Sequence, residues 1–262
     1  MATAYERVRI ARGAKRPTGI DYLQNVFHDF FELHGDRRYA DDPAIVGGLA
    51  YLGATPVTVI AIEKGHTAKE RVQRGFGAPQ PEGYRKALRL MRQAEKFHRP
   101  VVCFVDTSGA GCNVGAEERG QGEAIAECLT TMSALQTPVL SILIGEGGSG
   151  GALALAAGDR VWMLENAVYS VISPEGCATI LWKDAAKAEQ AAEELKLTAD
   201  DALALGVVES VIPEAGLGEP EFYDALSQRL MREIDALTEM PIQELLSARY
   251  ARFRRFGGEA QR

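Results

Sequence analysis

The sequence predicts an α/β fold whose strands pair mostly in parallel. Short runs rich in Val and Ile alternate along the chain with helical segments, which is the pattern of strand–helix–strand units. Several of these runs are apolar at every position, as in strands that are covered on both faces. With 262 residues, 46% of them hydrophobic, the chain can bury a core without disulfides or a structural metal.

The predicted elements follow one another in a regular order. The predicted strands are 56–62, 101–106, 139–144, 160–164, 169–173 and 207–212, all rich in apolar and β-branched residues. The predicted helices among them are 84–98, 117–135, 151–157 and 178–195. Beyond residue 219 we expect two more helices, separated at Met240-Pro241 because proline cannot continue a helix.

The charge of the chain argues against nucleic acid as its main partner. The net charge is −7, from 29 Lys and Arg against 36 Asp and Glu, and such an excess repels phosphate. The basic residues concentrate within 64–99, where only Glu70, Glu82 and Glu95 oppose them. No apolar run approaches the ~20 residues that span a membrane. No apolar segment near Met1 resembles a secretory signal, so we expect no membrane association.

The four cysteines indicate a reduced compartment. Cys103, Cys112, Cys128 and Cys177 form no CxxC pair, which excludes a zinc ribbon and a thioredoxin-type motif. Free thiols in a chain without an export signal are typical of the cytosol. We therefore expect a cytoplasmic protein.

Two predicted strands end in glycine-rich loops that open a helix. The first loop runs from Asp106 to Gly111 (DTSGAG), and the second, 145–151 (GEGGSGG), has five glycines in seven residues. Glycine at that density costs backbone entropy and lets a ligand approach the main chain closely. The first amides of the following helix have no intrahelical partner and stabilise negative charge. Tight packing of helix on sheet is the alternative explanation of both loops.

The second loop is compatible with three chemistries. Gly145, Gly147 and Gly150 match the GxGxxG dinucleotide fingerprint, with Glu165 twenty residues after Gly145, although the following helix is short. The segment 147–151 also matches the GxSxG nucleophile elbow around Ser149. All four histidines precede Ser149, which excludes the chain order of an α/β-hydrolase triad. The third chemistry is an oxyanion hole made of backbone amides.

Long motifs in the right order resemble the alpha subunit of bacterial acetyl-CoA carboxylase carboxyltransferase. The resemblance covers roughly residues 16–213. Its motifs are 16–42 (RPTGIDYLQNVFHDFFELHGDRRYADD), 75–87 (GFGAPQPEGYRKA), 115–121 (GAEERGQ), 145–152 (GEGGSGGA), 159–166 (DRVWMLEN), 169–177 (YSVISPEGC) and 180–184 (ILWKD).

The resemblance implies a crotonase/ClpP-like spiral fold of repeated ββα units with additional N- and C-terminal helices. We accordingly expect an N-terminal helical extension at 1–40, a carboxyltransferase core at 41–215 and a C-terminal helical tail at 216–262. The implied reaction, part of an ATP-dependent complex, moves a carboxyl group from carboxybiotin to acetyl-CoA. The product is malonyl-CoA for fatty-acid biosynthesis.

The resemblance also implies partners. Biotin is attached to a separate biotin carboxyl carrier protein and is carboxylated by biotin carboxylase. A zinc-containing beta subunit binds most of the CoA and shares the active site, usually in an assembly of two alpha and two beta chains. No metal is implied in this chain.

The site residues follow from the same resemblance. It assigns to this subunit one oxyanion hole for the ureido oxygen of biotin, and we predict that the amides of Gly150 and Gly151 form it. Further predicted site residues are Gly147 and Gly148, which shape the turn, Ser108, Gly109 and Ala110, which face the same cleft, and Ser173, Pro174, Glu175 and Gly176, which line the biotin side. Ser149 is predicted to be a turn residue, since no histidine follows it.

One segment departs from the family pattern. After Asp106-Thr107 the family usually has Pro-Gly-Ala-Tyr-Pro-Gly, whereas this chain has Ser108-Gly109-Ala110-Gly111-Cys112-Asn113. We expect the loss of the proline to affect the rigidity of this loop, and the loss of the aromatic residue to change one wall of the site. Backbone amides survive such side-chain changes.

Two charged groups have two interpretations each. Arg85, Arg89, Arg92 and Lys96 form one stripe of a helix, which is either a solvated face or an attraction for CoA phosphates and the acidic carrier protein. Glu117, Glu118 and Arg119 are expected at the start of a helix, where acids favour the helix dipole.

Three other classes of function remain open at this point. The chain could be a different crotonase-like acyl-CoA enzyme, a nucleotide-binding oxidoreductase that uses the GxGxxG match, or a non-catalytic subunit that recruits a partner. Acyl-CoA preference and assembly state are not encoded in any motif of this chain.

Overall fold

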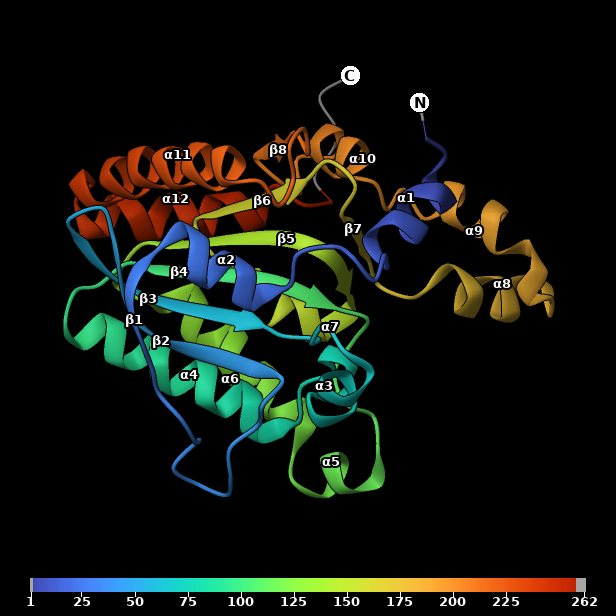
Figure 1. Ribbon diagram of the computed structural model, residues 1–262, viewed down its shortest axis with the longest axis horizontal. Coiled ribbons are helices and arrows are strands. Elements are labelled where there is room, and N and C mark those ends of the chain that lie inside the picture. Colours follow the sequence, from blue (N-terminus) through green and yellow to red (C-terminus); the bar gives the residue numbers. More distant parts are fainter. Residues whose placement is uncertain (1, 258–262) are drawn as a thin grey trace.

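A single eight-stranded sheet organises the chain in the computed structural model, which describes residues 2–257 (Figure 1). Its order is β1-β2-β3-β4-β5-β6-β8, and the short β7 pairs with β5. The strands are β1 (His28–Glu32), β2 (Ile45–Leu52), β3 (Thr55–Ile62), β4 (Val101–Thr107), β5 (Val139–Gly148), β6 (Arg160–Leu164), β7 (Val168–Ser170) and β8 (Ser210–Ile212).

The prediction of parallel pairing is confirmed for most of the sheet. Every pair from β3 through β4, β5 and β6 to β8 is parallel, and so is β5 with β7. All seven positions of β4 are buried, as its unbroken apolar character predicts. The strand β5 continues four residues past the predicted 139–144, so that the glycine-rich segment itself begins as strand.

The helices lie on both sides of this sheet (Figure 1). α4 (Pro81–Lys96) and α6 (Gln121–Ala134) pack together on one side, and α2 (Gly19–Val26) contacts α11 (Pro220–Glu239) on the other. The remaining helices are α1 (Ala4–Ala11), α3 (Ala68–Gln73), α5 (Val114–Glu118), α7 (Ser149–Leu153), α8 (Pro174–Trp182), α9 (Ala188–Glu194), α10 (Ala199–Ala204) and α12 (Ile242–Arg254), with 3-10 turns at Gly75–Gly77 and Ala185–Lys187.

The segment 1–40, expected as a helical extension, contains α1 and α2 but also a strand. β1 lies within it and pairs antiparallel with β2, which also escaped the sequence pattern. The reason is the glycine pair Gly47-Gly48 in the middle of β2. A Cβ at Gly48 would meet the Phe31 carbonyl and lie 2.9 Å from the Glu32 Cα, so close approach of the two strands excludes the β-branched residues that mark a strand.

The predicted helix at 117–135 is two helices. Gly120 adopts φ 80° between α5 and α6, a conformation that ends one helix and begins another. Asn113 caps the start of α5 by accepting the Ala116 amide at 2.9 Å. Glu117 lies in the first turn of this short helix, where an acid favours the helix dipole, whereas Glu118 is its last residue.

The C-terminal helices agree with the sequence pattern. α11 and α12 are separated by Met240-Pro241, as predicted, and the part of the expected tail beyond residue 257 lies outside the described residues. Within residues 2–257, no helix is both long and apolar enough to cross a membrane.

Candidate active site

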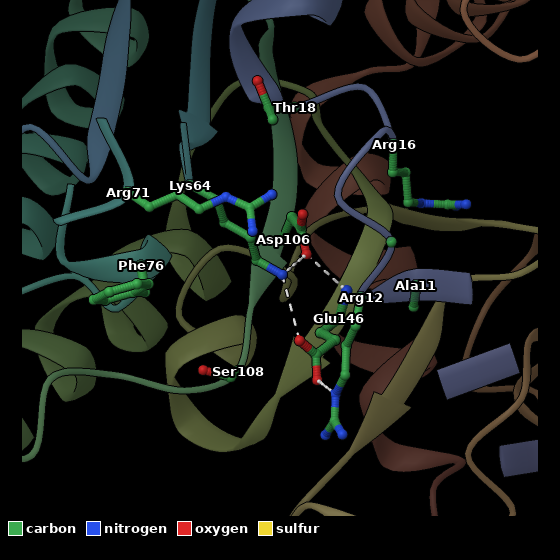
Figure 2. A pocket seen from close by; sticks show the side chains of 11 residues that line it. Ala11, Arg12, Arg16, Thr18, Lys64, Arg71, Phe76, Asp106, Ser108 and Glu146 are labelled. Carbon is green, nitrogen blue, oxygen red and sulfur yellow. Dashed lines mark hydrogen bonds and ion pairs between the residues drawn. The ribbon is translucent and has the colours of Figure 1, made fainter. Parts of the chain in front are cut away.

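The carboxyl ends of three adjacent parallel strands form the floor of the site. Lys64 follows β3, Asp106 lies near the end of β4, and Glu146 lies in the glycine-rich end of β5 (Figure 2). In parallel sheets this edge is where ligands bind, because loops and helix starts converge there. The two glycine-rich loops that the sequence singled out are thus neighbours in space.

The two loops pack directly against each other through their glycines. A Cβ added at Gly151 would lie 2.5 Å from the Ala110 amide nitrogen and 2.9 Å from the Gly109 carbonyl carbon. A Cβ at Gly148 would meet the Ser108 carbonyl group and lie 2.8 Å from the Gly109 nitrogen. Only glycine permits this approach, so these two glycines shape the site by packing.

Gly150 is different from its neighbours. The nearest atom to an added Cβ is the Ile125 Cγ2, at an ordinary 3.8 Å, and the backbone of Gly150 is not left-handed. Gly150 is part of the first turn of α7, where amides have no intrahelical partner. Packing does not require a glycine at this position.

The loop that departs from the family pattern is held without its proline. Thr107 accepts the Gly109 amide at 3.0 Å and donates its hydroxyl to the Gly109 carbonyl at 2.8 Å. The Gly111 amide donates to the Pro79 carbonyl at 2.9 Å, and Asn113 caps α5. Hydrogen bonds therefore order this segment in place of the ring.

A buried ammonium joins the strand ends. The Lys64 Nζ lies 2.5 Å from an Asp106 oxygen and 3.4 Å from a Glu146 oxygen, and the three side chains are 18%, 7% and 13% exposed (Figure 2). Burial alone would lower the pKa of Lys64, but the two carboxylates outweigh it and raise that pKa above the usual value. Lys64 is therefore charged throughout the physiological range.

Arg12 extends this network towards α8. Its guanidinium lies 2.8 Å from Glu146 and 2.7 Å from Glu175, at the first turn of α8. The hydrogen bond from Arg12 lowers the pKa of the Glu175 carboxyl below its ordinary value. Charge thus alternates across the site from Lys64 to Glu175.

Two cavities share this network as their common wall. The first, of about 220 Å³, is lined by Ala11, Arg12, Gly13, Arg16, Thr18, Lys64, Arg71, Phe76, Asp106, Ser108 and Glu146. The second, of about 250 Å³, is lined by Val8, Arg12, Ser108, Glu146, Gly147, Gly148, Ser149, Val168, Ser170, Val171, Ile172, Ser173, Pro174 and Leu197. Arg12, Ser108 and Glu146 belong to both, so the cavities are two parts of one cleft.

The structure brings several of the predicted site residues together. Ser108, Gly147, Gly148, Ser173 and Pro174 line the second cavity. Gly150 instead lines an adjoining hollow. Ser149, Ser170 and Val171 line both this hollow and the second cavity.

The other predicted site residues lie outside this lining. Gly109, Ala110 and Gly151 meet where the two loops pack together. Glu175 is turned to Arg12, and the Gly176 amide donates to the Ser173 hydroxyl at 3.1 Å, which caps α8.

Ser149 has the backbone of a nucleophile elbow without its chemistry. Its φ is 53°, which is unusual for a residue with a side chain, and it is exposed. Among the described residues, no histidine lines the cavity that contains it. Glu165, the acid of the dinucleotide fingerprint, instead accepts the Glu214 amide at 3.2 Å. The nucleophile-elbow hypothesis thus lacks a histidine partner for Ser149, and the dinucleotide-binding hypothesis lacks an acid free to bind a ribose.

The basic stripe of α4 is only half solvated. The buried Arg85 lies 2.7 Å from Asp36 and donates to the Arg119 carbonyl at 2.9 Å. Arg89 donates to the Gly35 carbonyl at 3.0 Å. The interpretation of a continuous solvated or ligand-attracting face is wrong for these two residues, and only Arg92 and Lys96 are exposed.

Sequence reasoning missed the charged members of the site. Asp106 and Glu146 lie within the two glycine-rich loops, but their side chains were assigned no role, and Lys64 and Arg12 belong to no motif that the sequence analysis singled out. Their common signal is position, because three of them stand at or just after the carboxyl ends of strands. As to metals, residues 2–257 contain no group of three or more His, Cys, Asp or Glu placed to hold an ion.

The chain matches a family model over nearly its whole length. Residues 1–257 match the family described as acetyl co-enzyme A carboxylase carboxyltransferase-like. The acetyl-coenzyme A carboxylase carboxyl transferase subunit alpha of Ruminiclostridium cellulolyticum is 58% identical over 255 residues, which are 97% of this chain and 98% of the relative. A Natranaerobius thermophilus protein named for subunits beta/alpha is 53% identical over 259 residues, covering 97% of this chain but 43% of that protein.

Solved structures share the fold at low identity. A Pseudomonas malonate decarboxylase hetero-tetramer in complex with coenzyme A aligns with a TM-score of 0.73 and 17% identity, over 91% of this chain and 98% of its counterpart. Transcarboxylase 12S aligns with a TM-score of 0.68 and 19% identity, over 84% of this chain and 42% of its counterpart. The predicted crotonase-like α/β fold is confirmed by these likenesses.

Proposed function

The chain belongs to the family of acetyl-CoA carboxylase carboxyltransferase alpha subunits, and from this premise we propose how its cleft takes part in the reaction. The proposed role is to hold the biotin side of carboxyl transfer, in which carboxybiotin supplies the carboxyl group and acetyl-CoA becomes malonyl-CoA. The observation that supports it best is the convergence of both glycine-rich loops with the Ser173-Pro174 turn around one cavity.

The cavity has a surface that suits a compact ring with one polar edge. Its apolar wall comes from Val8, Val168, Val171, Ile172 and Leu197, while its floor is the polar backbone of the glycine-rich segment. The close packing at Gly148 and Gly151 preorganises that backbone before any ligand arrives. The residues present therefore fit the ureido ring of biotin.

The chemistry assigned to this chain is electrostatic. Bound carboxybiotin would supply the carboxyl group, and the Gly150 and Gly151 amides, in the first turn of α7, would donate hydrogen bonds to its ureido oxygen, where negative charge would develop. A preorganised donor of this kind contributes about 3–4 kcal/mol to transition-state stabilisation. No side chain of the cleft is assigned the role of a nucleophile or a general base.

The proposal includes a partner for the CoA side. A zinc-containing beta subunit, in an assembly of two alpha and two beta chains, provides most of the CoA site. The Natranaerobius thermophilus relative supports this pairing, because its name joins beta and alpha in one protein. The biotin carboxyl carrier protein and biotin carboxylase complete the proposed complex, in the cytoplasm, where the free cysteines of this chain stay reduced.

Malonyl-CoA decarboxylation with free biotin as acceptor tests the function. We expect turnover when the chain is combined with its cognate beta subunit, and none from either chain alone, since the charge develops on two oxygens and this chain provides donors for one. Substantial turnover by the isolated chain would contradict the shared site.

The proposed amide donor is tested by replacing the N–H group of Gly150 with an oxygen atom. Replacing the amide at Gly150 with an ester, by installing glycolic acid there, deletes the donor and adds no side chain. We expect kcat to fall by about 10²–10³, the usual effect of one missing oxyanion donor. The matched control is Gly150→Ala, which keeps the amide and has room for its Cβ. Equal turnover of the ester and the control would remove Gly150 from the mechanism.

A further inference from the structure

The strand ends beneath the glycine-rich loop contain an ionic junction that no motif predicts. The Lys64 ammonium lies between two carboxylates that belong to different strands, Asp106 of β4 and Glu146 of β5. The same Asp106 accepts the backbone amide of Glu146 at 2.8 Å. Asp106 thus connects the ammonium of one strand end to the main chain of the next.

Close packing leaves this junction little freedom. A Cβ at Gly145 would lie 2.8 Å from an oxygen of the Asp106 carboxylate, so the carboxylate rests directly on the main chain of the loop. On the other side, a Cβ at Gly77 would lie 2.5 Å from the Cγ of Lys64. Glycines at both places let the stem of Lys64 and the carboxylate of Asp106 pack against backbone, so a displacement of either side chain is passed to the loop.

The charges require the ammonium. Asp106 and Glu146 are largely buried, and two buried carboxylates near each other repel unless a cation lies between them. Arg12 neutralises Glu146 from the opposite side but has no contact with Asp106 among its ion pairs. Within the described residues, Lys64 is the only cation in ion-pair contact with Asp106.

We propose that Lys64 is a positioning residue for the carboxyl transfer, which holds the Asp106 and Glu146 carboxylates together and thereby sets the place of the glycine-rich loop. The inference rests on the proposed function for its effect on rate. The amide at Gly150 lies four residues after Glu146 on the same short segment, so a shift at Glu146 moves the donor. Misplacement by about 1 Å can cost 10²-fold in rate.

The substitution Lys64→Met removes the charge and keeps most of the stem. Without the ammonium, Asp106 and Glu146 lose the cation that lies between them. Their mutual repulsion is then strongest at high pH, where carboxyl groups are ionised, and weaker at low pH. The variant should therefore be most impaired at high pH, whereas a merely structural lesion would impair it equally at every pH.

Other groups around Lys64 do not confuse this readout. Arg16 and Arg71, which line the same cavity, are unchanged by the substitution. His66, whose imidazole lies 3.0 Å from Asp21, is present in wild type and variant alike. The ratio of variant to wild-type rate at each pH cancels its contribution.

The experiment measures malonyl-CoA decarboxylation by the complex with the beta subunit from about pH 6 to 8.5. For Lys64→Met we expect kcat to be reduced about 100-fold at the upper end and about tenfold at the lower end, with KM for malonyl-CoA changed less than about twofold. The double variant K64M/D106N has no like-charge pair and should lose the pH dependence and recover part of the rate. A deficit that is the same at every pH, or no deficit, overturns the proposal.

Hydrogen exchange of the same complexes provides a second measurement, which does not require turnover. We expect faster amide exchange at residues 147–151 in Lys64→Met than in wild type, with β4 unchanged.

If Lys64→Met does not fold, Asp106→Asn provides the comparison, because it keeps the acceptor for the Glu146 amide and weakens the contact with Lys64. Unchanged exchange at 147–151 in the variant that folds overturns the positioning role. A wild-type complex without turnover would refute the proposed function, while the exchange result still decides the role of Lys64.

Discussion

Gly150 and Gly151 are adjacent, yet the structure predicts opposite effects of the same substitution. In Gly150→Ala the new Cβ has its nearest neighbour at 3.8 Å, so no atom must move. In Gly151→Ala the Cβ meets the Ala110 nitrogen at 2.5 Å, the Gly109 carbonyl carbon at 2.9 Å and the Tyr84 hydroxyl at 2.8 Å. Two of these atoms are backbone and cannot rotate away.

The magnitudes follow from these contacts. Alanine reduces the entropy that glycine loses in a helix, so Gly150→Ala should increase the free energy of unfolding by about 0.5–1 kcal/mol. Overpacking against a rigid neighbour costs about 1–3 kcal/mol, which Gly151→Ala should lose. The two variants should therefore differ by roughly 1.5–4 kcal/mol although they change the same number of atoms.

Urea unfolding of the two purified variants and the wild type measures this difference. The slope with urea should be common to all three, so that the midpoints report the folded state. Equal midpoints for the two variants, or a more stable Gly151→Ala, would show that the loops do not pack as described. The preorganisation of the oxyanion donors would then lose its structural basis.

Three further predictions concern residues around the site. Ser149→Gly should stabilise the chain by about 1 kcal/mol in thermal unfolding, because glycine adopts φ 53° without strain, and should leave turnover nearly unchanged. Arg85→Ala should cost about 3–5 kcal/mol in urea unfolding, since it leaves the buried Asp36 without its cation, whereas Arg92→Ala on the exposed part of the same helix should stay within about 0.5 kcal/mol. Burial would raise the pKa of Glu214, but Arg16 outweighs it and lowers that pKa, so the contribution of Glu214 to stability is present above its unfolded pKa and is lost as acid protonates it. Glu214→Gln should therefore flatten the loss of stability below about pH 4.3.

Each of these has a contrary outcome. A loss of several orders of magnitude in rate in Ser149→Gly would restore the nucleophile reading of that residue. Equal stabilities of the Arg85 and Arg92 variants would mean that the stripe on α4 is solvated throughout. If Glu214→Gln loses stability at low pH in the same way as wild type, other carboxylates cause that loss.

Local pattern was sufficient for the elements whose environment is uniform along the chain. β4 and β6 were predicted to within one residue because every position is apolar or nearly so, and the break at Met240-Pro241 follows from the geometry of proline alone. The glycine-rich segment 145–151 could also be identified locally, because five glycines in seven residues cost backbone entropy and indicate a close approach to the main chain. The family resemblance could be read from contiguous motifs.

Pattern was not sufficient where a residue's role depends on a distant partner. Lys64 and Glu146 are 82 positions apart and meet because parallel strands bring their ends to one edge of the sheet. Arg12, at the end of α1, and Glu175, in the first turn of α8, are 163 positions apart and meet only in the folded chain. The pairing of β1 with β2 depends on glycines that lower strand propensity, and the burial of Arg85 depends on Asp36 from another segment. Gly150 and Gly151 look alike in the sequence, and only the packing of one loop on the other separates them, because steric exclusion is a property of neighbours in space.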